Sequence, residues 1–169
     1  MKWTRSEILA APSQNVSAEE DIQIDASEFE GFSLLNSVRD VHVSANGFLD
    51  SDEDRFYAVL HVSGVMLLPD AITSEEIEYP FETESEEIYS FTDTDEEGVR
   101  VVADDVIELY PAICDAIIME VPLQVTNASE EDYPSGEGWA VITEEAYQRD
   151  RESRIDPRLA KLMEYKEEE

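Results

Sequence analysis

The sequence predicts an α+β fold: an antiparallel, curved β-sheet or partial barrel with a central apolar helix and a C-terminal helix. Three observations lead to this prediction. β-rich runs with alternating apolar residues occur through much of the first two-thirds of the chain. Helical spacing of apolar residues replaces the alternation between Asp104 and Val121. Near the end of the chain, Asp156-Pro157 is typical of a helix start, with Asp as the N-cap.

The predicted strands come first along the chain. Five runs have the composition of strands: 22–24, 38–44, 56–66, 76–81 and 87–91. Ala45-Asn46-Gly47 follows the second run, and the acidic segment 50–54 is a polar turn before the third. Because Pro80 has no N–H to donate to a neighbouring strand, we expect it at a sheet edge or a bulge.

The central helix is predicted near 106–120. Its apolar residues recur at helical spacing: Val106, Leu109, Tyr110, Ile113 and Ile117. Asp104 or Asp105 is the expected N-cap. Pro111 is unfavourable inside a helix, so the helix either begins close to Pro111, where the missing N–H is harmless, or kinks there. Pro122 ends the helix.

Beyond the central helix, the segment 126–138 is rich in Asn, Ser, Pro, Gly and acidic residues, which is typical of a loop. The apolar run 139–142 is expected to be a short strand, and 143–145 to start a helix. The last helix is expected to begin at Asp156 and to place Leu159, Leu162 and Met163 along one stripe.

Charge is distributed unevenly. The chain holds 42 acidic and 11 basic residues, a formal net charge of −31 over 169 residues. Six of the basic residues lie beyond Gln148: Arg149, Arg151, Arg154, Arg158, Lys161 and Lys166. We therefore predict two parts, an acidic β-rich domain over 1–148 and a basic, helical C-terminal segment over 149–169.

Composition also limits the classes of function. A sequence pI near 4.1 means that the surface repels phosphate, which argues against a general nucleic-acid binder, and the same field attracts cationic partners. The lone Cys114 permits neither an internal disulfide nor a cysteine-based zinc site. No apolar run has the length of a signal peptide or a membrane span. We expect a cytoplasmic protein that does not associate with membranes.

No catalytic, cofactor-binding or metal-binding residues are predicted. The sequence contains no H-E-x-x-H, G-x-S-x-G or P-loop motif. His42 and His61 lie on two predicted strands. They could pair as metal ligands, or one could act as a base. The simpler interpretation is that both are partly exposed strand residues. The acid-rich segment 82–97 is interpreted as a solvated loop rather than a calcium site, because it supplies only part of the calcium-loop pattern. We therefore expect a protein that is not an enzyme and has no cofactor.

The basic C-terminal segment has three possible uses: contact with phosphates, neutralisation of the acidic body, or docking to a partner protein through its apolar stripe. The predicted partner-binding residues are Trp139, Arg154, Asp156, Pro157, Arg158, Leu159 and Leu162. The oligomeric state and the identity of the partner stay open.

Several motifs carry a resemblance to a known family. They are Met1-Lys2-Trp3, the segments 62–69, 78–81, 108–113 and 117–122, Gly138-Trp139, and the closing segment 155–162, which reads Ile-Asp-Pro-Arg-Leu-Ala-Lys-Leu. In these segments the chain resembles the YceD family of bacterial and plastid proteins, the large ribosomal RNA subunit accumulation proteins, in the form found in Gram-positive bacteria. Many members carry cysteines in a C-x-x-C-like arrangement where this chain has 67–72 without cysteine, so a metal or redox role there does not carry over.

The resemblance implies a non-enzymatic role in the accumulation or processing of 23S ribosomal RNA and in biogenesis of the large ribosomal subunit. Combined with the charge, it predicts an adaptor whose acidic sheet face holds a basic ribosomal or rRNA-processing protein, while Arg158, Leu159 and Leu162 make the specific contact. Contact with rRNA is then indirect. The alternative is direct rRNA binding by the basic C-terminal segment, and a less favoured third is a carboxylate hydrolase that uses a divalent ion.

Overall fold

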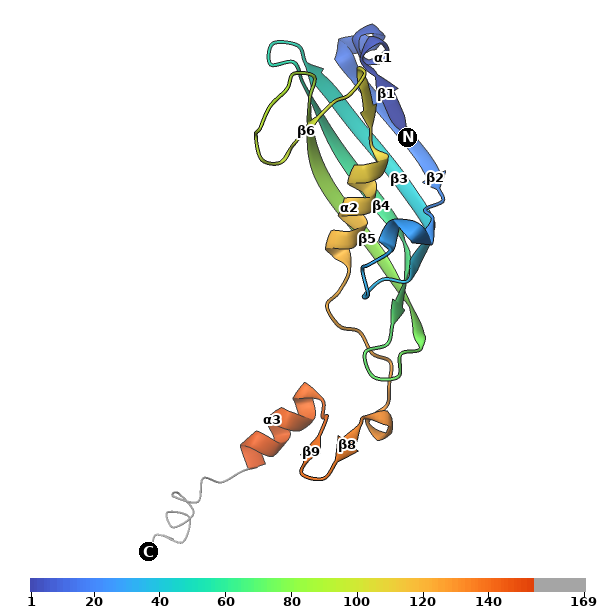
Figure 1. The fold of residues 1–169 in the computed structure, drawn as a ribbon, viewed down its shortest axis with the longest axis vertical. Coiled ribbons are helices and arrows are strands. Elements are labelled where there is room, and N and C mark those ends of the chain that lie inside the picture. The colour runs from blue at the N-terminus through green and yellow to red at the C-terminus, as the bar shows by residue number, and fades with distance from the viewer. Residues whose placement is uncertain (154–169) are drawn as a thin grey trace, which may run out of the picture. The chain divides into compact units, whose positions relative to one another are not determined.

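The computed structural model describes residues 1–153 of the chain. The chain divides into two compact units, the first from Met1 to Thr126 and the second beginning at Asn127 (Figure 1). The sequence-based division between 148 and 149 stays a prediction, because most of the segment 149–169 lies outside the described residues.

A five-stranded sheet forms the body of the first unit. Its strands are β2 (Asn15–Ile22), β3 (Ser37–Asp50), β4 (Arg55–Pro69), β5 (Glu76–Ser90) and β6 (Val99–Val101), in the spatial order β2-β3-β4-β5-β6. All neighbours are antiparallel except β5 and β6. The sheet is curved but does not close into a barrel, because β2 and β6 do not pair (Figure 1). The predicted α+β class and the predominantly antiparallel sheet are confirmed.

A second layer covers one face of this sheet (Figure 1). It consists of the two-stranded ribbon β1 (Lys2–Thr4) and β7 (Val106–Glu108), the helices α1 (Arg5–Ala10) and α2 (Tyr110–Glu120), and the short 3₁₀ turns η1 (Pro12–Gln14) and η2 (Ala26–Phe29). Thr4 caps α1 in a capping box with Glu7, which satisfies two backbone donors at the helix start.

The hydrophobic core lies between the sheet and this second layer. Alternate residues of β4 are buried beneath the second layer: Phe56, Ala58, Leu60, Val62, Met66 and Leu68. Above them, α2 buries Ile113 and Ile117 completely. The ring of Phe56 lies 5.6 Å from that of Trp3 and 6.4 Å from that of Tyr89, measured between centroids. Burying each large side chain of this kind contributes about 1.5–3 kcal/mol.

The predicted strand 22–24 is wrong except for Ile22, because the strand that pairs with β3 is Asn15–Ile22. Two further predicted strand boundaries are wrong because pairing with β4 extends the strands beyond their local patterns. β3 continues through Ala45-Asn46-Gly47 to Asp50, and the turn of 51–54 then leads into β4, in agreement with the predicted turn. The two runs 76–81 and 87–91 belong to one strand, β5, which pairs with β4 along its whole length. The first part of the acid-rich segment, from Glu82 to Ser90, is therefore strand and not loop.

The edge position of Pro80 is confirmed. Pro80 pairs with Val65 on β4, whereas β6 pairs only with Ile88–Ser90 of β5. Among the described residues, β5 therefore has no second hydrogen-bonded neighbour from Glu76 to Glu87. The missing N–H of Pro80 is tolerated because it can face this open edge.

The central apolar helix is confirmed but begins later than predicted. Residues 106–108 form β7, and the N-cap of α2 is Leu109, without a side-chain hydrogen bond. Asp104 and Asp105 are therefore not caps; both have positive φ, 53° and 56°, in the turn before β7. Pro111 lies in the first turn of α2, so of the two predicted alternatives the helix start near Pro111 is confirmed. Pro122 follows the C-cap residue.

The second unit contains η3 (Glu130–Asp132), the two-residue strands β8 (Ser135–Gly136) and β9 (Trp139–Ala140), and α3 (Glu144–Ser153). The predicted strand 139–142 is confirmed only for its first half. The predicted helix start at 143–145 is confirmed, because the Thr143 hydroxyl accepts a hydrogen bond from the Ala146 N–H at 3.0 Å, as an N-cap does. The helix predicted from Asp156 lies outside the described residues.

Candidate functional site

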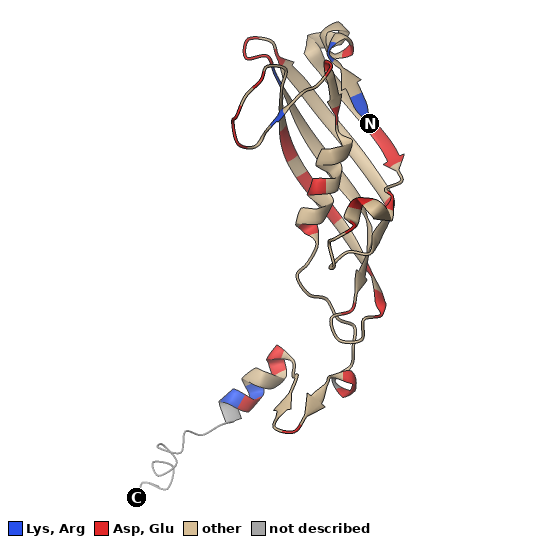
Figure 2. Cartoon of the chain, in the orientation of Figure 1, with Lys and Arg blue, Asp and Glu red and all other residues tan. Residues whose placement is uncertain are grey.

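The face of the sheet away from α2, here called the outer face, carries an ordered array of polar side chains. Reading from β2 to β5, four cross-strand rows define it: Asp21–His42–Ser63–Glu82, Glu19–Ser44–His61–Glu84, Ser17–Asn46–Val59–Glu86 and Asn15–Phe48–Tyr57–Ile88. None of these residues is buried. All carboxylates of these rows thus lie on the flanking strands, while the two middle strands carry His, Ser, Asn, aromatic residues and Val59. Figure 2 shows acidic residues along β2 and β5.

Both histidines lie on strands of the outer face and contact carboxylates of the flanking strands. His42 Nδ1 lies 2.8 Å from Asp21 Oδ1, and its Nε2 lies 3.2 Å from Glu19 Oε1. His61 Nδ1 lies 3.1 Å from Glu84 Oε2. The hydrogen bond to Asp21 raises the pKa of His42, and the charge of Glu19 adds to this effect.

The two histidines face opposite sides of the array. His42 contacts β2 and His61 contacts β5, although the pairing places them diagonally next to each other. Within residues 1–153, no group of three or more His, Cys, Asp or Glu side chains is arranged to hold a metal ion. The histidines of the array thus make separate contacts with carboxylates on neighbouring strands.

Every arginine of the first unit is held by a carboxylate of the same unit. The pairs are Arg5 with Asp54 and Asp105, Arg39 with Asp40 and Glu78, Arg55 with Glu96, and Arg100 with Glu87 and Asp115. Residues 1–126 contain 29 acidic residues against five Lys and Arg. The first unit thus has a large excess of negative charge, and its guanidinium groups are already engaged.

A hollow of about 360 Å³ indents the outer face near the β3–β4 turn. Its lining includes Ser17, Asn46 and Val59 along one row, with Phe48 and Tyr57 beside them. The rings of Phe48 and Tyr57 are stacked, with centroids 5.2 Å apart and planes 17° apart. The Tyr57 hydroxyl donates to Glu53 at 3.0 Å, and this hydrogen bond raises the pKa of Tyr57.

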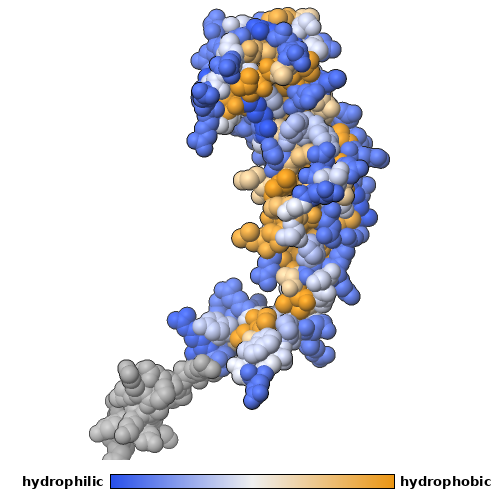
Figure 3. All heavy atoms as spheres, viewed as in Figure 1, coloured by the Kyte–Doolittle hydropathy of each residue, from blue (hydrophilic) through white to orange (hydrophobic). Residues whose placement is uncertain are grey.

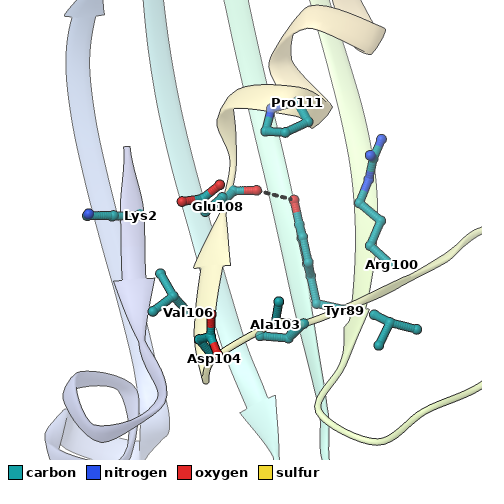
Figure 4. A pocket seen from close by; sticks show the side chains of 10 residues that line it. Lys2, Tyr89, Arg100, Ala103, Asp104, Val106, Glu108 and Pro111 are labelled. Carbon is teal, nitrogen blue, oxygen red and sulfur yellow. Dashed lines mark hydrogen bonds between the residues drawn. The ribbon is translucent and has the colours of Figure 1, made fainter.

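A second pocket, of about 470 Å³, opens on the side of the sheet that carries β1 and β7 (Figure 4). The Tyr89 hydroxyl donates to the backbone carbonyl of Glu108 at 3.4 Å, and burial raises the pKa of Tyr89. Of the two basic residues in its lining, Lys2 points away from the other lining side chains, and the Arg100 guanidinium is held by carboxylates (Figure 4). The Tyr89 hydroxyl and the Arg100 guanidinium are thus both engaged in contacts within the protein.

Asp70 organises the turn after β4, within the cysteine-free segment 67–72. Its carboxylate accepts hydrogen bonds from the N–H groups of Ile72 and Thr73, at 2.8 and 3.0 Å, and from the Thr126 hydroxyl at 2.9 Å. Asp70 is only 4% exposed. The turn after β4 is thus stabilised by a buried carboxylate in this chain.

Cys114 is buried in α2, and this burial raises the pKa of its thiol. A buried thiol with a raised pKa is a poor nucleophile, because the reactive species is the thiolate. The interpretation of Cys114 as a small hydrophobic residue of the helix face agrees with its position in the core.

The second unit exposes a set of apolar side chains: Trp139, Val141, Ile142 and Tyr147. Trp139 is 57% exposed, and its indole lies over Gly136, where a Cβ would stand 2.5 Å from Nε1. Apolar surface of this unit is visible in Figure 3. Trp139 is thus accessible to a partner, although its role stays a prediction.

The other predicted partner-binding residues cannot be placed in this way. Arg154, Asp156, Pro157, Arg158, Leu159 and Leu162 lie outside the described residues.

Phe48 and Tyr57 were not predicted from the sequence as site residues, although their spacing around a turn could have indicated them. The two residues flank the turn of 51–54 at nearly equal distances, so a hairpin around that turn brings them opposite each other.

Among the described residues, no helix combines the length and the apolar character needed to cross a membrane.

The profile of the family described as "Large ribosomal RNA subunit accumulation protein YceD" matches residues 58–166. A Bacillus subtilis (strain 168) protein named "Uncharacterized protein YlbN" is 31% identical over 170 aligned residues, which cover 96% of this chain and 94% of the relative. No solved structure matches the chain significantly. The resemblance read from the motifs is thus confirmed: the chain belongs to the YceD family, in agreement with a Gram-positive type of member.

Proposed function

We propose that this protein is a non-enzymatic, cytoplasmic accessory factor in the accumulation or processing of 23S rRNA, and hence in biogenesis of the large ribosomal subunit. It acts there as an acidic adaptor that holds a basic ribosomal or rRNA-processing protein. Membership of a family described as large ribosomal RNA subunit accumulation proteins supports the ribosome-related part of this proposal. The adaptor mechanism rests on the charges of the first unit.

The observation that carries the adaptor mechanism is the combination of excess acid with engaged arginines. The first unit has 29 acidic residues, and its four arginines all pair with carboxylates of their own unit. Such a surface repels bare rRNA within the ~8 Å screening length of physiological salt and attracts Lys- and Arg-rich chains. The outer face offers the attracted chain two strands whose carboxylates are exposed.

The side chains most often used in catalysis support a non-enzymatic role. His42 and His61 are each bound to carboxylates, and Cys114 is a buried thiol with a raised pKa. Ser63 lies opposite His42 and Ser44 opposite His61, but both ring nitrogens of His42 lie against Glu19 and Asp21, and Nδ1 of His61 lies against Glu84. We therefore assign the outer face to binding and not to a reaction.

The test is a binding measurement between the full-length chain and a purified basic protein of the large ribosomal subunit across a salt series. Affinity is expected to fall as salt rises. The triple variant E82Q/E84Q/E86Q removes three charges from the outer face, and D93N/D95N/E97Q removes three from the loop after β5 as the matched control. We expect the first variant to weaken binding several-fold more than the second. Affinity that is indifferent to salt, or tight binding of naked 23S transcripts at cellular ionic strength, contradicts the adaptor.

The alternative is direct rRNA binding by the basic C-terminal segment. One observation favours it: six of the 11 basic residues lie at or beyond Arg149, and Arg151 is exposed on α3. A gel-shift assay with 23S rRNA fragments tests this alternative, using the full chain and the variant R151A/R154A/R158A. A shift that this variant abolishes, seen without a second protein, replaces the adaptor with direct binding.

A further inference from the structure

A stacked aromatic pair, in which Phe48 is exposed and Tyr57 is half-buried, distinguishes one end of the outer face. Phe48 and Tyr57 lie opposite each other on β3 and β4, and their rings are stacked at 5.2 Å. Phe48 is 47% exposed. Large aromatic side chains that stay in water on a strand indicate a contact surface, because they contribute much binding area at low entropic cost.

The hollow next to this pair is large enough for a long side chain. It has a volume of about 360 Å³, and its polar floor comes from Ser17 and Asn46, with Val59 as an apolar patch. The stacked rings form one wall. A guest side chain would therefore contact the aromatic pair and the hydrogen-bond acceptors of Ser17 and Asn46.

The charges around the hollow select the kind of guest. Glu86 lies in the same cross-strand row as Val59, and Glu19 and Glu84 flank the next row. On the other side, Glu53 accepts the hydrogen bond of the Tyr57 hydroxyl. These carboxylates repel the phosphates of a nucleic acid whose bases would stack on the rings. They attract a guanidinium group, which stacks flat on aromatic faces and donates to carboxylates.

We propose that this hollow seats an arginine side chain of an extended, Lys- and Arg-rich segment of the partner protein, stacked against Phe48 and Tyr57. The proposal rests on the adaptor function and names its anchoring point. In an extended segment, alternate residues repeat about every 6.6–6.8 Å, which is also the spacing between successive rows on the outer face. An arginine in the hollow therefore places the next-but-one residue beside the row of Glu19 and Glu84, so an Arg-x-Arg or Arg-x-Lys spacing fits best.

The experiment measures binding of fluorescently labelled 12-residue peptides to the full-length chain by anisotropy. One probe alternates arginine with serine, the second alternates lysine with serine, and the third is a 12-nucleotide uridylate RNA. The test variants are F48T, F48T/Y57T and Y57F, which keeps the ring. The matched control is Y79T, since Tyr79 is 38% exposed but pairs with the buried Met66, and so lies on the opposite face.

The arginine probe is expected to bind more tightly than the lysine probe and to lose about fivefold in affinity in F48T/Y57T. F48T alone loses part of this affinity, whereas Y57F and Y79T change it less than twofold. At higher salt all affinities fall. The ratio of the wild-type affinity to the F48T/Y57T affinity persists, because stacking on the rings is less sensitive to screening than the attraction by the carboxylates is. Thermal unfolding of each variant checks that the fold is kept, and F48T provides the result if the double variant unfolds.

The outcomes separate this proposal from the adaptor function. If the arginine probe binds equally to wild type and F48T/Y57T but is weakened in E82Q/E84Q/E86Q, the seat is wrong and the adaptor stands. If neither basic probe nor a basic ribosomal protein binds, both are wrong. If the RNA probe binds and F48T/Y57T abolishes that binding, the aromatic pair stacks on bases, and the arginine seat is rejected.

Discussion

The hydroxyl of Thr126 donates a hydrogen bond to the buried carboxylate of Asp70, 2.9 Å away. This contact ties the end of the first unit to the turn after β4, and the same carboxylate also accepts from Ile72 and Thr73. Asp70→Ala leaves these donors without their acceptor, so we expect a loss of about 2–4 kcal/mol in the free energy of unfolding, measured with urea. Thr126→Val, which removes one of these donors, is the control and should cost about 1 kcal/mol. Equal stability of Asp70→Ala and wild type contradicts this account.

Gly47 is required by the ring of Phe56. A Cβ at Gly47 would stand 2.2 Å from Phe56 Cζ, closer than atoms can approach. Gly47→Ala must therefore displace a fully buried ring, and we expect it to destabilise the protein by about 1–3 kcal/mol in chemical unfolding. The double variant Gly47→Ala/Phe56→Leu should lose less than the sum of the two single changes, because the smaller side chain removes the clash. Additive losses would show that the two positions are independent.

The ion pair of His42 gives stability a defined pH dependence. The hydrogen bond to Asp21, assisted by Glu19, raises the pKa of His42 above its ordinary value of 6.5. Because the pKa is higher in the folded state, protonated His42 contributes to the free energy of unfolding. This contribution is complete below pH 6.5 and is lost as the pH rises through the folded-state pKa. The stability difference between wild type and His42→Gln should therefore shrink as the pH rises above 6.5. Titration of the imidazole by NMR measures the pKa directly, and a value at or below 6.5 contradicts the prediction.

Trp139 offers a test of the second unit. Its indole is 57% exposed, whereas Trp3, the only other tryptophan, is 8% exposed. In a Trp3→Phe background, binding of the basic ribosomal protein should shift the emission of Trp139 to shorter wavelength. Trp139→Ser should weaken binding about tenfold, as a buried interface tryptophan does. Met119→Ser, on a side chain of the first unit that is 85% exposed, is the control and should leave the affinity unchanged. Equal affinities of Trp139→Ser and wild type remove Trp139 from the interface.

The fold class could be predicted because the apolar pattern follows the final structure over most of the core. The alternation from Phe56 to Met66 and the helical spacing from Leu109 to Ile117 both depend on residues close in sequence. The strand boundaries could not be predicted in the same way. Asn46-Gly47 has the composition of a turn, but Gly47 lies inside β3 because a ring from another strand occupies its Cβ position. Likewise, the glutamate-rich part of β5 is a strand because β4 pairs with it throughout.

The candidate site was predictable in its charge and not in its geometry. Composition alone indicates a cationic partner, but the arrangement of carboxylates in two flanking strands depends on which strands are neighbours. The start of α2 was misjudged for a related reason. Asp104 and Asp105 are good capping residues by type, yet the strand β7 intervenes because it pairs with β1, from the opposite end of this unit's sequence.

The open edge of β5 has a consequence for the behaviour of concentrated samples. Backbone groups from Glu76 to Glu87 that point away from β4 have no strand to bond with among the described residues, and such an edge invites pairing with the same edge of another molecule. Here, two identical β5 edges brought together would place glutamates next to glutamates. At Pro80 the ring nitrogen has no hydrogen to donate to the other edge. The residues that suit the surface to a positively charged guest thereby also protect it from aggregation by edge-to-edge strand pairing.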